Sequence, residues 1–260
     1  MDGQSLRELI DRHRITLLQA TPSTWRLLLE SGWRGTDGLK ALCGGEALPV
    51  DLARELQSRV GSVWNMYGPT ETTVWSTIHR IAEDERSIPI GHPIANTQVY
   101  VLDEQRNLCP VGVRGEIWIA GTGVTLGYWQ RDDLTAERFV ADPFAQAHGG
   151  LMYRTGDLGR LRFDGRLECA GRTDFQVKIR GHRIELGEIE AVLGTHPAIA
   201  RCVVDARILP SGERALCAYI QWRGDQVEEW QTLRDHLREH LPDYMVPAAW
   251  TAIVTVPTTP

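Results

Sequence analysis

A chain of 260 residues is long enough to bury a large core and to form one or two domains. Its formal net charge of -6 provides no excess positive field, which excludes nucleic acid and anionic lipid as main partners. No apolar run approaches the ~20 residues of a membrane helix and the charged start lacks an apolar signal core, so we expect a cytoplasmic protein.

The first part of the chain, residues 1–89, alternates helix and strand, which predicts α/β architecture with a parallel sheet of βαβ units. The predicted elements in chain order are a helix with capping-box spacing at 5–8, a strand over 15–18, a helix that Thr21-Pro22 begins, a strand over 39–43, a helix over 51–60 and a strand over 63–66. In such sheets ligands bind beyond the carboxyl ends of the strands. The segments 44–46 and 65–73 both follow such ends, so both are candidate ligand turns.

The middle part, residues 90–173, has a different pattern. Short strands over 97–102 and 115–120 and a hairpin over 161–168 with an Asp-Gly turn predict an antiparallel, barrel-like unit. We expect three tryptophans in the core, namely Trp118, Trp129 and Trp230.

The last part, residues 174–260, predicts a small α+β unit. It contains a basic, strand-like segment over 177–184, a helix over 185–193, strands over 200–206 and 215–222, and an amphipathic helix over 228–241. We therefore predict a large subdomain over 1–173 that is only partly present, followed by a small C-terminal subdomain over 174–260 that is truncated at its end.

Five dense motifs follow one another along the chain. They are Tyr67-Gly68-Pro69-Thr70-Glu71, the segment 115–129, Tyr153-Arg154-Thr155-Gly156-Asp157, the segment 171–190 and the segment 241–247. In this order and spacing they closely resemble the adenylation domains of nonribosomal peptide synthetases, from about Leu6 to the last residue. Those domains belong to the adenylate-forming superfamily, together with acyl-CoA synthetases and firefly luciferase.

The resemblance implies an amino-acid-activating ligase. Such an enzyme joins the carboxylate of an amino acid to the α-phosphate of ATP with Mg²⁺, and releases pyrophosphate. It then passes the aminoacyl group to the phosphopantetheine thiol of a peptidyl carrier protein.

The resemblance also implies roles for the turn after the strand over 63–66. Tyr67 would stack on adenine, Thr70 would bond a phosphate oxygen and Glu71 would hold Mg²⁺, a hard cation that prefers carboxylate oxygen. Gly68 would let the backbone approach the nucleotide. The other members implied for the nucleotide side are Gly44, Gly45, Glu46, Asn65 and Met66.

Further roles follow from the later motifs. Asp157 would accept bonds from the ribose hydroxyls, and Arg172 would reach the ribose and phosphate region. Asp174 matches the hinge about which the small subdomain rotates between the two half-reactions. Lys178 lies on the strand that can swing towards the nucleotide as a catalytic group. The loop that faces the pantetheine channel after rotation contains Arg180 and Gly181.

Plainer structural interpretations stay open for several of these residues. Asp157 follows Gly156 and could simply cap a turn, and Glu71 taken alone could be a solvated acid. The basic run over 178–183 could be an exposed strand edge, where positive charge blocks edge pairing.

The substrate pocket is partly visible through the resemblance. Its implied walls are Ser23, Leu42, Gly44, Met66, Val74 and Trp75. Gly44 leaves room, whereas Met66 and Trp75 take room, so we expect a small or medium substrate side chain. The identity of the amino acid and of the peptide product does not follow from the sequence.

Three parts of the family pattern are absent from the sequence, and one of them is the upstream acidic residue that pairs with the α-amino group of the substrate. The phosphate loop is expected upstream of Leu6, and a catalytic lysine is expected just after the segment 254–260. We therefore expect the rear part of an adenylation domain, inactive alone, that works with the missing upstream and downstream parts of a synthetase. A sequence fragment, a split enzyme and a decayed remnant are open, and so are an acyl-CoA ligase fragment and a non-catalytic module that docks a carrier protein.

Overall fold

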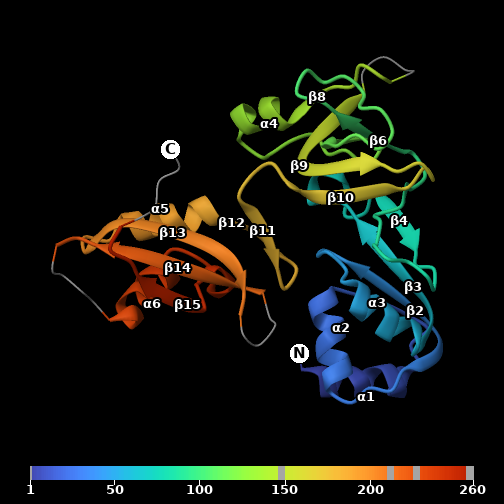
Figure 1. Ribbon diagram of the computed structural model, residues 1–260, viewed down its shortest axis with the longest axis horizontal. Coiled ribbons are helices and arrows are strands. Elements are labelled where there is room, and N and C mark those ends of the chain that lie inside the picture. The colour runs from blue at the N-terminus through green and yellow to red at the C-terminus, as the bar shows by residue number, and fades with distance from the viewer. Residues whose placement is uncertain (1, 146–149, 210–213, 225–228, 256–260) are drawn as a thin grey trace. The chain divides into compact units, whose positions relative to one another are not determined.

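The computed structural model describes residues 2–145, 150–209, 214–224 and 229–255. The chain divides into two compact units, Met1–Asp174 and Phe175–Pro260 (Figure 1). Parts of two predicted segments lie outside the described residues, namely Glu228 at the start of the amphipathic helix and the stretch 256–260. In the part of the chain that is described, no helix has the length and apolar character needed to cross a membrane.

The first unit opens with a five-stranded sheet in the order β1-β2-β3-β4-β5. Its strands are β1 Leu17–Ala20, β2 Thr36–Gly44, β3 Val60–Tyr67, β4 Thr77–Arg80 and β5 His92–Pro93. The first three are parallel, as predicted, and the last two pair antiparallel. The connecting helices are α1 Gly3–His13, α2 Pro22–Glu30, α3 Val50–Gln57 and the single 3₁₀ turn η1 Thr70–Thr72. Their apolar faces share one core with the sheet, which includes Trp25, Leu39 and Leu52.

Two local predictions in this region are wrong. The cap of α1 is Asp2, whose carboxylate accepts from the Ser5 backbone N–H at 2.8 Å, so Ser5 lies inside the helix and does not cap it. Helix α3 ends at Gln57, because Val60 already pairs with Thr36 in the sheet. The predicted start of α2 is confirmed: Thr21 is its N-cap and Pro22 its first residue.

The second sheet of this unit is antiparallel, in the order β10-β9-β7-β6, with β8 beside β9. Its strands are β6 Thr97–Leu102, β7 Gly115–Gly121, β8 Phe139–Ala141, β9 Leu151–Leu161 and β10 Leu167–Arg172, and α4 Asp132–Arg138 precedes β8. The predicted hairpin is confirmed, since Leu161 pairs with Leu167 across the turn and Gly165 has φ 78°. A shared cluster joins the two sheets, in which Tyr67 from β3 packs with Ile117 and Ile119 from β7.

The three tryptophans that we expected in the core differ in how deeply they are buried. Trp118 is buried, and Trp230 is partly buried against the core of the second unit. Trp129 is 88% exposed, so its predicted place in the core is wrong.

The second unit contains a two-stranded ribbon and a three-stranded sheet. Its elements are β11 Gln176–Ile179, β12 His182–Glu185, α5 Leu186–Gly194, β13 Ile199–Ile208, β14 Arg214–Trp222, α6 Trp230–Arg238, η2 Asp243–Met245 and β15 Ala249–Ala252. One apolar core joins them. It includes Ile189 of α5, Ile220 of β14, and Leu233 and Leu237 of α6, which confirms the predicted apolar stripe of the last helix.

Candidate functional site

The two predicted ligand turns lie at the same edge of the first sheet. Strands β2 and β3 are parallel neighbours, and Gly44 at the end of β2 pairs with Met66 at the end of β3. The segment 44–46 and the segment that begins at Asn65 therefore leave the sheet side by side. Asn65 itself is buried, and its side-chain amide donates to the Pro89 carbonyl at 2.8 Å.

The turn after β3 is tightly constrained. A Cβ on Gly68 would lie 2.6 Å from the Val74 carbonyl oxygen, so only glycine fits there. Thr73 and Val74 have φ angles of 60° and 71°, a left-handed conformation that is costly for β-branched residues. Strain of this kind persists where the surrounding structure fixes the backbone. Thr70 begins the 3₁₀ turn and is exposed.

Glu71 points into the unit, where two tyrosines hold it. Glu71 is only 8% exposed. Its Oε1 atom accepts hydrogen bonds from Tyr128 Oη at 2.6 Å and from Tyr153 Oη at 2.7 Å. Burial, followed by the bond to Glu71, raises the pKa of the Tyr128 hydroxyl well above its ordinary value, so this group stays a donor. Two donors on one oxygen fix the rotamer of the carboxylate.

Both tyrosines lie within motifs of the sequence, Tyr128 in the segment 115–129 and Tyr153 in the segment 153–157, but the resemblance implied no role for either. Tyr128 lies in the loop between β7 and α4, and Tyr153 lies in β9 of the second sheet, so neither partner of Glu71 belongs to the sheet of β3. The sequence signal that could have identified them is the presence, inside each motif, of an aromatic residue with a hydroxyl group. The interpretation of Glu71 as a freely solvated acid does not fit its burial.

Asp157 forms a second buried centre. It is 6% exposed, and its two carboxylate oxygens accept from different residues: Oδ2 from Tyr67 Oη and Oδ1 from Arg172 Nη1, each at 2.5 Å. Burial, followed by the charge of Asp157, raises the pKa of Tyr67 well above its ordinary value. Two residues from two other motifs therefore meet at the carboxylate of Asp157.

The Tyr67 ring is itself enclosed. The residue is 8% exposed and packs in the apolar cluster between the two sheets. Its hydroxyl is committed to Asp157. Stacking of this ring on adenine stays a prediction, whereas the structure directly shows its link to the carboxylate.

Arg172 also clamps Asp174. Its Nε donates to Oδ1 at 2.6 Å and its Nη2 donates to Oδ2 at 2.9 Å, a two-pronged ion pair. A Cβ on Gly156 would lie 2.8 Å from Arg172 Nη2 and 2.9 Å from Asp174 Oδ2. Gly156 therefore makes room for the guanidinium, and the predicted hinge residue is tied to the Asp157 centre.

The predicted pocket residues are only partly brought together. Leu42 and Gly44 are two apart in β2 and so face the same side of the sheet, where Gly44 pairs with Met66. The Trp75 ring covers this spot, because a Cβ on Gly44 would lie 2.2 Å from its Cη2 atom. Trp75 Nε1 donates to Gln19 Oε1 at 3.0 Å, which holds the ring in place and was not predicted.

The other two pocket residues have different surroundings. Ser23 donates from its backbone N–H and its Oγ to Glu46 Oε2, at 3.2 and 2.8 Å. Glu46 thereby binds the first turn of α2, where a negative charge is favoured. Val74 is 54% exposed, and nothing described places it against Leu42 or Gly44.

The remaining predicted residues lie in the other compact unit, on the hairpin of β11 and β12. Lys178 pairs with Arg183 across the ribbon, and the two loop residues Arg180 and Gly181 have φ angles of 50° and 79°. Two consecutive positive φ angles are typical of a two-residue type I′ turn. This geometry requires glycine or a strained residue at the tip, whatever the function of the loop.

Comparison with known proteins gives consistent matches. The family model described as AMP-binding enzyme matches residues 1–129, and the model of the AMP-binding enzyme C-terminal domain matches residues 188–260. The chain is 49% identical, over 260 residues and all of its length, to a dimodular nonribosomal peptide synthase of Bacillus subtilis (strain 168), of which it covers 11%.

Two solved structures are also similar. One is a four-domain holo nonribosomal peptide synthetase bound to AMP and glycine, with 50% identity and a TM-score of 0.64 over 99% of this chain and 19% of that one. The other is a holo protein with adenylation and PCP domains, bound to a vinylsulfonamide inhibitor, with 31% identity and a TM-score of 0.86 over 100% of this chain and 45% of that one. The chain thus spans less than half the length of each of these relatives.

Proposed function

Because this chain belongs to the family of AMP-binding enzymes, we propose that it is the rear part of an amino-acid adenylating domain of nonribosomal peptide synthesis. The observation that carries the proposal is the convergence of Tyr67, Asp157 and Arg172, each from a different motif, on one buried centre. Tyr67 and Arg172, which lie 90 residues before and 15 residues after Asp157, both donate hydrogen bonds to its carboxylate. Coincidental motif matches give no reason for this convergence.

The proposed reaction has two halves. The amino acid carboxylate attacks the α-phosphorus of ATP, a P–O bond forms, and pyrophosphate leaves with the electron pair of the broken bond. The phosphopantetheine thiolate of a carrier protein then attacks the aminoacyl carbonyl carbon and AMP leaves. The protein's part is to position the reactants and to stabilise charge that develops in the transition state.

Within this reaction Asp157 is proposed to receive the ribose hydroxyls, with Arg172 and Tyr67 holding the carboxylate in place. Thr70 is exposed at the turn, where its hydroxyl can reach a phosphate oxygen. Arg172 connects this centre to Asp174, so rotation at the proposed hinge would change the position of Arg172 in the nucleotide site. Lys178 and the tip formed by Arg180 and Gly181 are proposed to act after that rotation.

Glu71 fits the proposed Mg²⁺ site by the chemistry of its donor atoms. A buried carboxylate with a fixed rotamer offers the hard oxygen that this ion prefers. When bound, Mg²⁺ would neutralise phosphate charge. The part of the protein is to orient this carboxylate through Tyr128 and Tyr153.

The substrate is proposed to carry a small side chain. The Trp75 ring fills the space beside Gly44, and Met66 lies in register with that glycine. The similar four-domain synthetase bound to AMP and glycine supports a small substrate. An acyl-CoA ligase is the competing candidate, and the 49% identity to a nonribosomal peptide synthase favours the amino acid branch.

Activity is proposed to require more of the domain than these 260 residues. The chain covers 45% of the similar protein with adenylation and PCP domains. We therefore expect no measurable aminoacyl adenylate from the isolated chain, and activity once the rest of the domain is supplied.

The test is ATP–pyrophosphate exchange with a domain completed by the flanking segments of a close relative. We expect exchange with one or a few small amino acids and none with fatty acids. Asp157→Ala should raise the KM for ATP by about tenfold or more, because a bond to a charged acceptor contributes about 1.5–3 kcal/mol. The matched control is Asp164→Ala, which removes an exposed carboxylate in the β9–β10 turn and should leave exchange unchanged.

Three outcomes would contradict the proposal in different ways. Exchange driven by fatty acids alone would move the chain to acyl-CoA ligases. An unchanged KM for ATP and an unchanged turnover in Asp157→Ala would show that Asp157 does not bind the nucleotide and only caps a turn. A completed domain that binds a carrier protein but exchanges with none of the twenty amino acids would favour a non-catalytic docking module.

A further inference from the structure

The end of α6 carries a cluster that the proposed function does not use. The sequence His236-Leu237-Arg238-Glu239-His240 places two histidines four residues apart with a glutamate between them. The chain stays helical just past the end of α6: Glu239 N donates to Asp235 O at 3.1 Å, and His240 N closes a tighter, 3₁₀-type turn on Leu237 O at 3.0 Å. The two histidines and Glu239 therefore share one face of a helical turn. This spacing is the one by which two helical histidines bind a single zinc ion.

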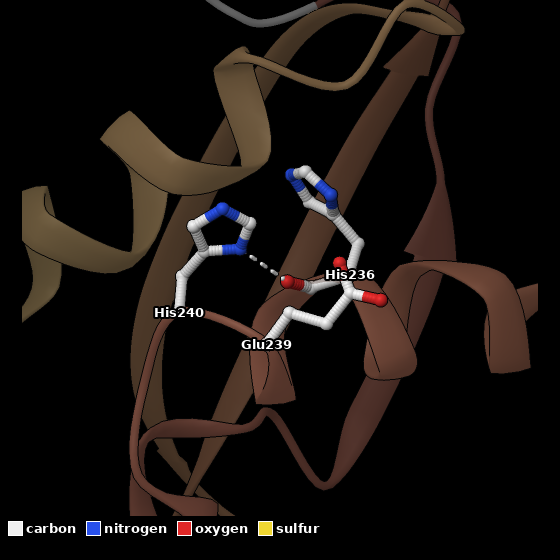
Figure 2. A group of neighbouring side chains, drawn as sticks. All are labelled: His236, Glu239 and His240. Carbon is white, nitrogen blue, oxygen red and sulfur yellow. Dashed lines mark hydrogen bonds between the residues drawn. The ribbon is translucent and has the colours of Figure 1, made fainter.

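The three side chains are gathered in space as well as in sequence. Each of His236, Glu239 and His240 offers one ligand atom, and these atoms lie within 4.8 Å of one another (Figure 2). Ligands in a tetrahedral site lie about 3.4 Å apart when each is about 2.0–2.1 Å from the ion. Small side-chain rotations close the difference. His236 is half-buried, whereas Glu239 and His240 are exposed and can move.

The hydrogen bonds of the two rings define which nitrogen can bind. Nε2 of His236 contacts the Val192 carbonyl oxygen at 3.1 Å, and Nδ1 of His240 contacts the His236 carbonyl oxygen at 2.9 Å. A carbonyl only accepts, so each of these nitrogens carries the proton and the other nitrogen of each neutral ring keeps its lone pair. Metal-binding histidines are typically held in this way, with the second ring nitrogen donating to a carbonyl or carboxylate.

The surroundings favour a cation. An open hollow of about 430 Å³ beside α6 is lined by His236 and by three carboxylates, those of Glu229, Asp235 and Glu239. The hollow gives an ion and its remaining water ligands access from solvent. Imidazole nitrogen with a single carboxylate suits zinc, nickel or copper better than magnesium or calcium, which prefer oxygen alone.

We propose that His236, Glu239 and His240 form a surface binding site for a divalent transition-metal ion of the zinc type. The site leaves at least one position for water, because three side chains supply fewer than the four ligands of a tetrahedral ion. Since His236 also contacts Val192 of α5, a bound ion would brace the end of α6 against α5. The inference does not depend on the adenylation activity.

The test is calorimetric titration of the untagged 260-residue chain with Zn²⁺, followed by Co²⁺ titration monitored by visible absorption. We expect one saturable site per chain and Co²⁺ bands typical of low coordination number. His240→Ala and Glu239→Gln should each weaken Zn²⁺ binding by at least about tenfold, comparable to the loss of a supporting contact of a metal ligand. Both residues are exposed, so neither change disturbs the core.

The matched control is His13→Ala, an exposed histidine at the end of α1. It should bind Zn²⁺ as tightly as the unaltered chain. The five cysteines remain in every variant, so any Zn²⁺ binding by thiols is the same in all of them. Absence of saturable Zn²⁺ binding, or equal affinity in His240→Ala, Glu239→Gln and the unaltered chain, would overturn the proposal.

Discussion

The two compact units place their candidate functional groups in different surroundings. The first unit buries them: Glu71 and Asp157 are less than 10% exposed, and they are held by hydroxyls of tyrosines far away in the chain and by the guanidinium of Arg172 on the neighbouring strand. The second unit has a single apolar core and carries its candidate functional groups on a hairpin tip and at a helix end.

This difference indicates that the candidate functional groups of the first unit contribute to its stability, whereas those of the second unit can change without a large loss of stability. A buried carboxylate must keep its partners or leave an uncompensated charge, so its geometry is fixed before any ligand arrives. An exposed hairpin tip can present different side chains at little cost in stability. The first arrangement suits binding in a fixed geometry, and the second suits groups that act after a movement.

The largest effect on this comparison is expected from Asp157→Ala. The change leaves the Arg172 guanidinium and the Tyr67 hydroxyl without their shared acceptor, and breaking a buried pair costs about 3–5 kcal/mol. Urea unfolding of the 260-residue chain measures this cost, with Asp164→Ala as the exposed control. A loss below about 1 kcal/mol would mean that the buried centre is not coupled to stability.

A somewhat smaller effect is expected from Leu233→Ala in the second unit. Leu233 is fully buried in the single core of that unit, and truncation of a buried leucine costs about 2–5 kcal/mol. Hydrogen exchange should show faster opening of β13 and β14 and unchanged protection of β2 and β3. The exposed control is Leu126→Ala. Equal loss of protection in both units would show that they unfold together and would break the comparison.

Tyr153→Phe is expected to have a moderate effect. It removes one of two hydroxyl donors to Glu71 at constant ring shape, and a bond to a charged acceptor contributes about 1.5–3 kcal/mol. The Tyr128 hydroxyl still donates to the same oxygen, so the loss of unfolding free energy should lie near the lower value. Tyr100→Phe serves as control, because its longer bond to Asp142 is at a half-buried site. If Tyr100→Phe loses as much stability, the hydrogen bonds to Glu71 contribute no more to the stability of the first unit than an ordinary half-buried hydrogen bond.

The smallest effect on stability is expected from Lys178→Ala. Its strand is half-exposed, and surface substitutions of this kind usually change the unfolding free energy by no more than about 0.5 kcal/mol. In the completed domain the same variant should lower the rate of aminoacyl transfer to the carrier protein, because Lys178 is proposed to act after the rotation. The other lysine of the chain, Lys40 in β2, provides the matched Lys40→Ala control. A large loss of stability in Lys178→Ala would make the ribbon a structural element and remove the contrast between the units.

The sequence by itself determined what depends on neighbouring residues. Alternating helix and strand patterns predicted the parallel sheet, the Asp-Gly pair predicted the turn between β9 and β10, and Thr21-Pro22 predicted the start of α2. These signals are short in range, because periodicity, capping and turn geometry involve residues a few positions apart. They also placed the segment 44–46 and the turn after β3 at one sheet edge.

Only the tertiary structure decided what depends on strands that are far apart in the chain. Tyr67 and Asp157 are 90 residues apart, and the tyrosines that hold Glu71 lie 57 and 82 residues after it, so no local pattern could pair them. The exposure of Trp129 was likewise decided by packing, since an aromatic side chain is buried only where another element covers it. Residue types could be read from the sequence, but the partners that fix their chemistry were set by sheet register and by the contact between sheets.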